Sequence, residues 1–217
     1  MTVRAFGRHP DAAAHHDPRS RSFPAGISPL RTVVHKHAGP VLDQGSVSAC
    51  TGYATAGALN AAPNRGRRRL LAGRDALALY TRATRIDPYD GWYPDTDGGS
   101  DGLSAAKAAR EAGYISSFQH AFGVGHALGA LVNAPIIVGT LWRESMSSPG
   151  RDGFVRLSGE VVGGHEWAII GLNVEKQYVI ALQSWGAAWG MNGRFFVSFE
   201  DFGALLADGG DATVLVR

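Results

Sequence analysis

Short apolar runs after position 134 predict β-strands in the second half of the chain. Five such runs are separated by polar or glycine-containing turns, at 136–142, 154–157, 166–172, 178–182 and 194–199. Short runs rich in Val, Ile, Leu, Phe and Trp are typical of strands, whereas helices need longer stretches. The pattern predicts an antiparallel sheet or an open barrel.

Before position 134 the apolar residues follow helical spacing instead. The Ala- and Gly-rich stretch 50–62 is ended by Pro63, and the stretch 101–112 is stopped by Gly113. Acidic caps at the start and glycine or proline at the end are ordinary marks of helix boundaries. Further helices are predicted at 75–85, 125–133 and 200–207.

These patterns divide the chain into an arm and two lobes. Residues 1–40 are rich in Arg, His, Pro and Ser and show little periodicity, so we expect an extended arm, of which 17–23 pack across the body. Residues of about 41–133 predict a helical lobe, and about 134–217 a β lobe. The fold class is therefore α+β, with one domain over 41–217.

Composition and charge exclude several classes of protein. The chain has 217 residues, 45% of them hydrophobic, and a formal net charge of +2, which is ordinary for one globular domain. A single cysteine excludes an intramolecular disulfide, and no stretch has the apolar length of a signal segment or membrane span. We expect a cytoplasmic monomer with no nucleic-acid partner, no membrane partner, no metal and no cofactor.

The single cysteine, Cys50, lies where a polar turn meets the first predicted helix. The N–H groups of a first helical turn lack intrahelical partners and carry the positive end of the helix dipole. A thiolate is therefore favoured there over a thiol, which makes Cys50 a candidate nucleophile.

A candidate base and its orienting group lie more than a hundred residues downstream. His165 follows two glycines at the start of a predicted strand, and Gln183 ends the next strand beside Ser184 and Trp185. The Gln183 side-chain oxygen can accept a hydrogen bond from the imidazole while Trp185 covers that contact from water. Glu166, next to His165, is expected on the opposite face of the strand.

Four segments together resemble the papain-like cysteine peptidases. These are DQGSVSAC, DGGSDGLSAAKAAREAGYI, GGHEWAIIG and QSWGAAWGMNGRFFV, which span most of the chain from 41 to about 202. The compact microbial and viral branch of that family is the most similar, because a threonine follows the cysteine there, as Thr51 does here. The resemblance implies a helical lobe that carries the nucleophile, packed against a β-barrel-like lobe.

The resemblance also implies roles for single residues. Cys50 is the nucleophile, His165 the general base and acid, Gln183 the imidazole orienter in place of the family's usual Asn, and Gln44 an oxyanion donor. For substrate binding it implies three residues: Gly98, Gly99 and Trp185.

The predicted function is a cysteine endopeptidase that hydrolyses protein or peptide substrates through an acyl-enzyme on Cys50. Two alternatives use the same residues. One is an amide-transfer, deamidase or deconjugating enzyme, and the other is a catalytically silent binding scaffold.

Overall fold

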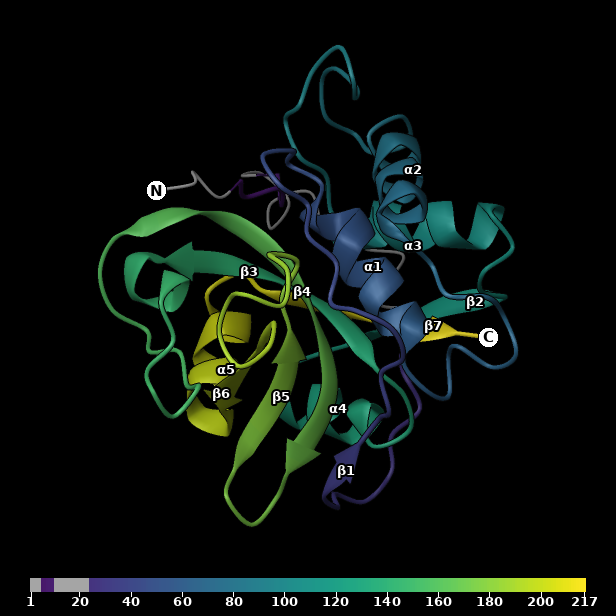
Figure 1. The fold of residues 1–217 in the computed structure, drawn as a ribbon. Helices are drawn as coiled ribbons and strands as arrows, with labels where there is room; N and C mark the ends of the chain where they lie inside the picture. Colours follow the sequence, from purple (N-terminus) through teal and green to yellow (C-terminus); the bar gives the residue numbers. More distant parts are fainter. Residues whose placement is uncertain (1–4, 10–23) are drawn as a thin grey trace.

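One antiparallel sheet organises the computed structural model, which describes residues 5–9 and 24–217 (Figure 1). Its strands follow the order β2-β7-β3-β4-β5-β6, and β1 pairs with β4. The strands are β1 (Val33–Val34), β2 (Ser117–Ala121), β3 (Ile136–Arg143), β4 (Val161–Asn173), β5 (Tyr178–Leu182), β6 (Arg194–Ser198) and β7 (Asp211–Val216). The α+β class predicted above is confirmed.

Three helices pack together against one side of the sheet (Figure 1), namely α1 (Cys50–Asn60), α2 (Gly73–Ala83) and α3 (Gly102–Glu111). Small residues of α1 let its neighbours approach closely: a Cβ on Gly52 would lie 2.2 Å from the Ala76 carbonyl oxygen of α2. Together with sheet residues these helices bury an alanine-rich core that includes Ile137, Ala168 and Ile170.

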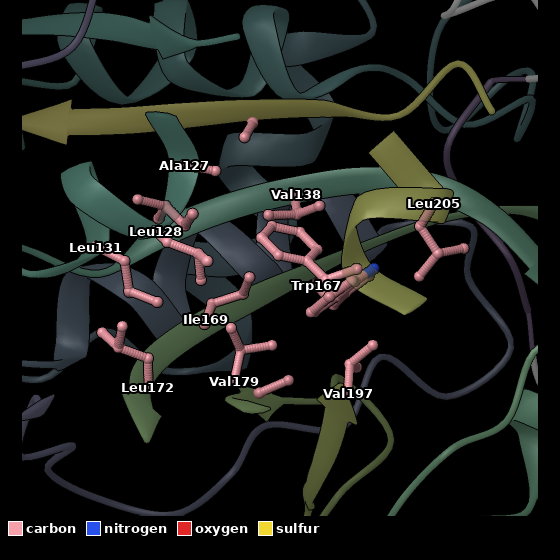
Figure 2. Close-up of a cluster of buried hydrophobic side chains, with 14 of the residues drawn as sticks. Ala127, Leu128, Leu131, Val138, Trp167, Ile169, Leu172, Val179, Val197 and Leu205 are labelled. Carbon is pink, nitrogen blue, oxygen red and sulfur yellow. The ribbon is translucent and has the colours of Figure 1, made fainter. Parts of the chain in front are cut away.

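The other face of the sheet carries a second, more aromatic core. It is covered by α4 (Val124–Leu131), the 3-10 helix Glu144–Ser147 and α5 (Phe199–Ala207). Figure 2 shows part of this core, with Trp167 of β4 near Val138 of β3 and Leu205 of α5. The buried indole N–H of Trp167 donates to the Thr140 hydroxyl at 3.1 Å, so the polar edge of the ring is satisfied.

Most predicted elements occur close to where the sequence placed them. All five helices form, and four of the five predicted strands correspond to β3, β4, β5 and β6. The strand predicted at 154–157 is wrong, because only Phe154 makes an isolated bridge, to Phe196, and its ring packs on Tyr178 and Phe196. Strands β1, β2 and β7 were not predicted.

The predicted arm is described only in part. The expectation that residues 17–23 pack across the body falls outside the described residues. Downstream of them, β1 pairs with β4 through Val33 opposite Leu172 and Val34 opposite Gly171. Within the described ranges, no helix combines the length and apolar character needed to cross a bilayer.

Candidate active site

Cys50 is the first residue of α1, and its side chain is fully buried. The turn before it is held from the helical side of the molecule: the Ser48 N–H donates to both oxygens of Asp97, and the Tyr80 hydroxyl donates to the same carboxylate. From the sheet side, the Glu166 N–H donates to the Cys50 sulfur at 3.2 Å. The fold therefore brings Cys50 against the residue that follows His165.

His165 of β4 contacts Gln183, which follows β5. Its Nε2 lies 2.5 Å from the Gln183 Oε1 atom, and the backbone N–H of Ser184 donates to that same oxygen at 2.9 Å. Because the oxygen is the acceptor for Ser184, the imidazole must donate through Nε2. In the neutral ring Nδ1 is then unprotonated, and it has no hydrogen-bond partner among the described residues. The arrangement leaves a buried basic nitrogen.

Aromatic rings enclose the imidazole. Trp142 and Trp185 both have ring centroids 4.9 Å from that of His165, and Phe6 approaches edge-on at 6.0 Å. Burial among these rings lowers the pKa of His165 to about 4, although its hydrogen bond to Gln183 acts in the opposite direction.

Ser184 joins the two glutamines of the site. Its hydroxyl donates to the Gln44 Oε1 atom at 2.5 Å, and its carbonyl accepts from the Gln44 backbone N–H at 2.8 Å. This fixes the Gln44 carboxamide with its Nε2 as the donor, which binds the carbonyl oxygens of Val47 at 2.9 Å and Ala5 at 3.3 Å. The bridging position of Ser184 was not predicted from the sequence, in which its place beside Gln183 is the one available signal.

Residues 5–9 cross the site between two walls, one formed at Gly164 of β4 and the other at Ser100. The Arg8 N–H donates to the Gly164 carbonyl at 3.0 Å, while on the other side the Ser100 N–H donates to Gly7 at 2.9 Å and the His9 N–H donates to Ser100 at 2.8 Å. Gly7 faces Cys50 so closely that a Cβ added to it would lie 2.0 Å from the Ser48 carbonyl oxygen and 3.0 Å from the Cys50 nitrogen. This segment covers both Cys50 and His165.

The two predicted substrate-binding glycines lie differently. Gly99 has a φ of +84°, and a Cβ on it would lie 2.6 Å from the Gly7 carbonyl oxygen. Its backbone thus approaches the crossing segment as closely as glycine allows. A Cβ on Gly98 would meet nothing within 4 Å, and the backbone hydrogen bonds to the segment come from Ser100. Trp185, the third predicted contact, is buried against Phe6 and His165.

The covered site favours neutral forms of both reactive groups. Burial, followed by the nearby Glu166 carboxyl, raises the pKa of the Cys50 thiol, against which the backbone N–H groups of Glu166, Gly7 and Thr51 act. With the His165 pKa lowered as well, the covered form holds a thiol and a neutral imidazole rather than an ion pair.

Glu166 lies on the face of β4 opposite to His165, as strand alternation predicts. A Cβ on Gly102 of α3 would lie 2.5 Å from its Oε1 atom, and one on Gly139 of β3 would lie 2.6 Å from its Oε2 atom. Burial, and then the charge of Asp211, raise the pKa of this carboxyl well above its usual range, while Arg8 acts to lower it.

Comparison with solved structures identifies the architecture. Xylellain, a cysteine protease from Xylella fastidiosa, superposes with a TM-score of 0.75 over 100% of this chain and 98% of its own, at 18% sequence identity. The chain has the papain-like fold. Procathepsin L 3 of Tenebrio molitor matches with a TM-score of 0.69 and 17% identity, over 97% of this chain and 76% of its own.

A third papain-like structure, the procathepsin B S9 of Trypanosoma congolense, also has a TM-score of 0.69, at 12% identity over 98% of this chain and 86% of its own. At sequence level, no family model and no curated protein matches. The papain-like fold is thus established by three-dimensional similarity at low sequence identity.

Proposed function

We propose that the chain is a papain-like cysteine peptidase, with residues 41–217 as its catalytic domain. One observation carries the proposal: Gln183 holds His165 through Nε2, so that the basic Nδ1 is left for the thiol of Cys50. A cysteine, a base and a group that orients the base are the set of groups that activates a thiol nucleophile.

The reaction follows from these atoms. His165 Nδ1 takes the proton of the Cys50 thiol, and the thiolate attacks the carbonyl carbon of the peptide bond. The imidazolium then gives its proton to the leaving amine, which departs and leaves an acyl-enzyme. Water attacks that thioester while His165 removes its proton, and collapse of the intermediate releases the acid and the thiol.

The contacts that Gln44 makes in this structure support its role as an oxyanion donor. Its Nε2 already donates to a peptide carbonyl, that of Ala5, and Ser184 fixes the carboxamide orientation. The Cys50 backbone N–H supplies a second donor at the helix start. A preorganised donor of this kind is worth about 2.7 to 4 kcal/mol of transition-state stabilisation.

Residues 5–9 lie across the candidate site in the direction opposite to the one that we infer for a substrate. His165 protonates the leaving amine, so the amine half of a substrate lies on the His165 side, where Phe6 packs. The acyl half then lies on the opposite side of Cys50, and we assign Arg8 to that side because the segment continues from Phe6 at His165 through Gly7 at Cys50 to Arg8. A substrate therefore runs from the Arg8 side to the Phe6 side in its N-to-C direction, whereas residues 5–9 run the opposite way.

Hydrolysis of a mixed peptide library, followed by mass spectrometry, tests the proposal. We expect new termini with wild type and none with Cys50→Ala or His165→Ala, the two matched controls. New amide bonds to an added amine, in place of hydrolysis, would favour the amide-transfer alternative. No turnover in any variant, including one with the segment displaced, would favour the binding scaffold.

A further inference from the structure

Arg8 has a buried guanidinium in a pocket beside the candidate active site. Its side chain is 1% exposed, and its Nη2 donates to Asp211 Oδ2 and to the Gly209 carbonyl, both at 2.9 Å. Burying a charge is costly unless it is paired and hydrogen-bonded. The pocket therefore supplies the groups that a guanidinium needs.

A second carboxyl, that of Glu166, closes the same pocket. It is fully buried, and neither of its oxygens has a hydrogen-bond partner among the described residues. A Cβ on Gly139 would lie 2.6 Å from Arg8 Nε and 2.6 Å from Glu166 Oε2, so both atoms lie over that glycine. The pocket thus combines two carboxyls and a carbonyl with a floor that has no side chain.

The position of this pocket relative to Cys50 indicates which residue of a substrate would enter it. Gly7 faces Cys50, and Arg8 is the next residue, on the acyl side of the site. The backbone around Arg8 pairs with Gly164 and Ser100 in the manner of an added strand. A side chain that enters this pocket from a substrate belongs to the second residue on the N-terminal side of the bond that is cut.

We propose that Asp211, Glu166 and the Gly209 carbonyl form a subsite that selects arginine at this second residue of the substrate, and that Arg8 occupies it in the covered form. This inference rests on the proposed peptidase function. Arginine suits the pocket better than an aliphatic side chain, which would remove the cation that pairs with Asp211 and lies beside the fully buried Glu166 side chain. The Nη2 atom of Arg8 carries two N–H groups, which donate to the Asp211 carboxylate and the Gly209 carbonyl, and the planar guanidinium fixes the direction of both bonds.

A cleavage assay on the full chain tests the selectivity. Gly7→Ala displaces the covering segment, and the substrates are fluorogenic peptides with arginine or its neutral isostere citrulline at the second residue. We expect kcat/KM to be roughly 10- to 100-fold higher for arginine, the range for a hydrogen bond to a charged group. Equal rates for the two peptides would overturn the proposal.

Substitution of the pocket assigns the preference to its residues. In the Gly7→Ala background, Asp211→Asn is expected to remove most of the arginine preference. Asp152→Asn is the matched control, because Asp152 forms an exposed ion pair with Arg156 elsewhere on the surface. An unchanged preference in a folded Asp211→Asn variant would also overturn the proposal. Because the citrulline comparison needs no pocket variant, the test stands even where that variant does not fold.

A binding assay separates this inference from the proposed function. The labelled peptide AFGRH, the sequence of residues 5–9, is titrated into Cys50→Ala/Gly7→Ala and its fluorescence anisotropy recorded beside that of a citrulline version. Binding at least about tenfold tighter with arginine supports the pocket, even if no peptide is ever cut. Cleavage without any arginine preference would leave the peptidase standing and remove the subsite.

Discussion

A single methyl group on Gly7 is expected to uncover the candidate active site. Its Cβ would lie 2.0 Å from the Ser48 carbonyl oxygen, whereas real Cβ contacts do not fall below 3.0 Å. Gly7→Ala must therefore move the segment away from Cys50 by about 1 Å. A shift of that size stretches the hydrogen bonds at 2.8 to 3.0 Å between residues 7–9 and the two walls beyond useful length.

The expected magnitude follows from those bonds. Among the described residues, three bonds between backbone groups hold the segment, at Arg8 to Gly164, Ser100 to Gly7 and His9 to Ser100. At about 1 kcal/mol net each, their loss changes the balance between covered and open forms by about 3 kcal/mol, or roughly 100-fold. Since Cys50 is fully buried in the covered form, its reaction with an alkylating reagent requires the open form.

The assay is the rate of iodoacetamide addition to Cys50, followed by intact mass near neutral pH. Gly7→Ala should react roughly 100-fold faster than wild type. Gly26→Ala is the matched control, because a Cβ there meets nothing within 4 Å, and it should react like wild type. Equal rates for wild type and Gly7→Ala would show that the segment does not control access to the thiol.

Three further predictions concern the residues around the imidazole. In the Gly7→Ala background, Gln183→Ala should lower kcat for peptide hydrolysis roughly 10- to 100-fold by freeing the ring, and Gln183→Asn should retain more of it; equal losses would contradict an orienting role. Ser184→Ala should lower kcat as well, by a smaller factor, because it removes the hydroxyl that fixes the Gln44 carboxamide but keeps the backbone N–H that donates to Gln183, and an unchanged kcat would argue against that role of Ser184. Burial lowers the pKa of His165 to about 4 in the folded chain, so its neutral form contributes stability that is complete above the unfolded value and lost as pH falls from about 6.5 to about 4. The stability difference between wild type and His165→Gln, from urea unfolding, should shrink by about 3 kcal/mol across that window, and a constant difference would contradict the lowered pKa.

Most of the helices and strands could be predicted from local patterns in the sequence. Helices α2 and α3 have apolar residues at helical spacing, and strands β3 to β6 are short apolar runs, so each could be predicted from its own residues. Strand β7 was missed because its hydrogen-bonding partners are distant in sequence, with Val214 opposite Ile136 and Gln119. At 154–157 the chain makes one isolated bridge, between Phe154 and Phe196, and the Phe154 ring packs on Tyr178 and Phe196, a choice that the sequence pattern does not reveal.

Some residues of the candidate site could likewise be predicted from the sequence, and others could not. Cys50, His165 and Gln183 stand at the ends of predicted elements, where the residue type and its position already suggest chemistry. By contrast, residues 5–9 have no periodicity of their own, and Arg8 pairs with Asp211 two hundred and three positions away. Such a contact depends on the finished fold, so neither the covered state nor the arginine pocket could be predicted from the sequence.

The central claim, that His165 activates Cys50, is tested most directly by the pH dependence of Cys50 alkylation in Gly7→Ala and in Gly7→Ala/His165→Ala. A peptidyl epoxide is applied from about pH 4 to about pH 9, and the modified fraction is read by intact mass. If His165 activates Cys50, labelling is rapid well below pH 7 and is lost without His165. Labelling that rises only near the ordinary thiol pKa of about 8.5 and is indifferent to His165 would contradict that claim.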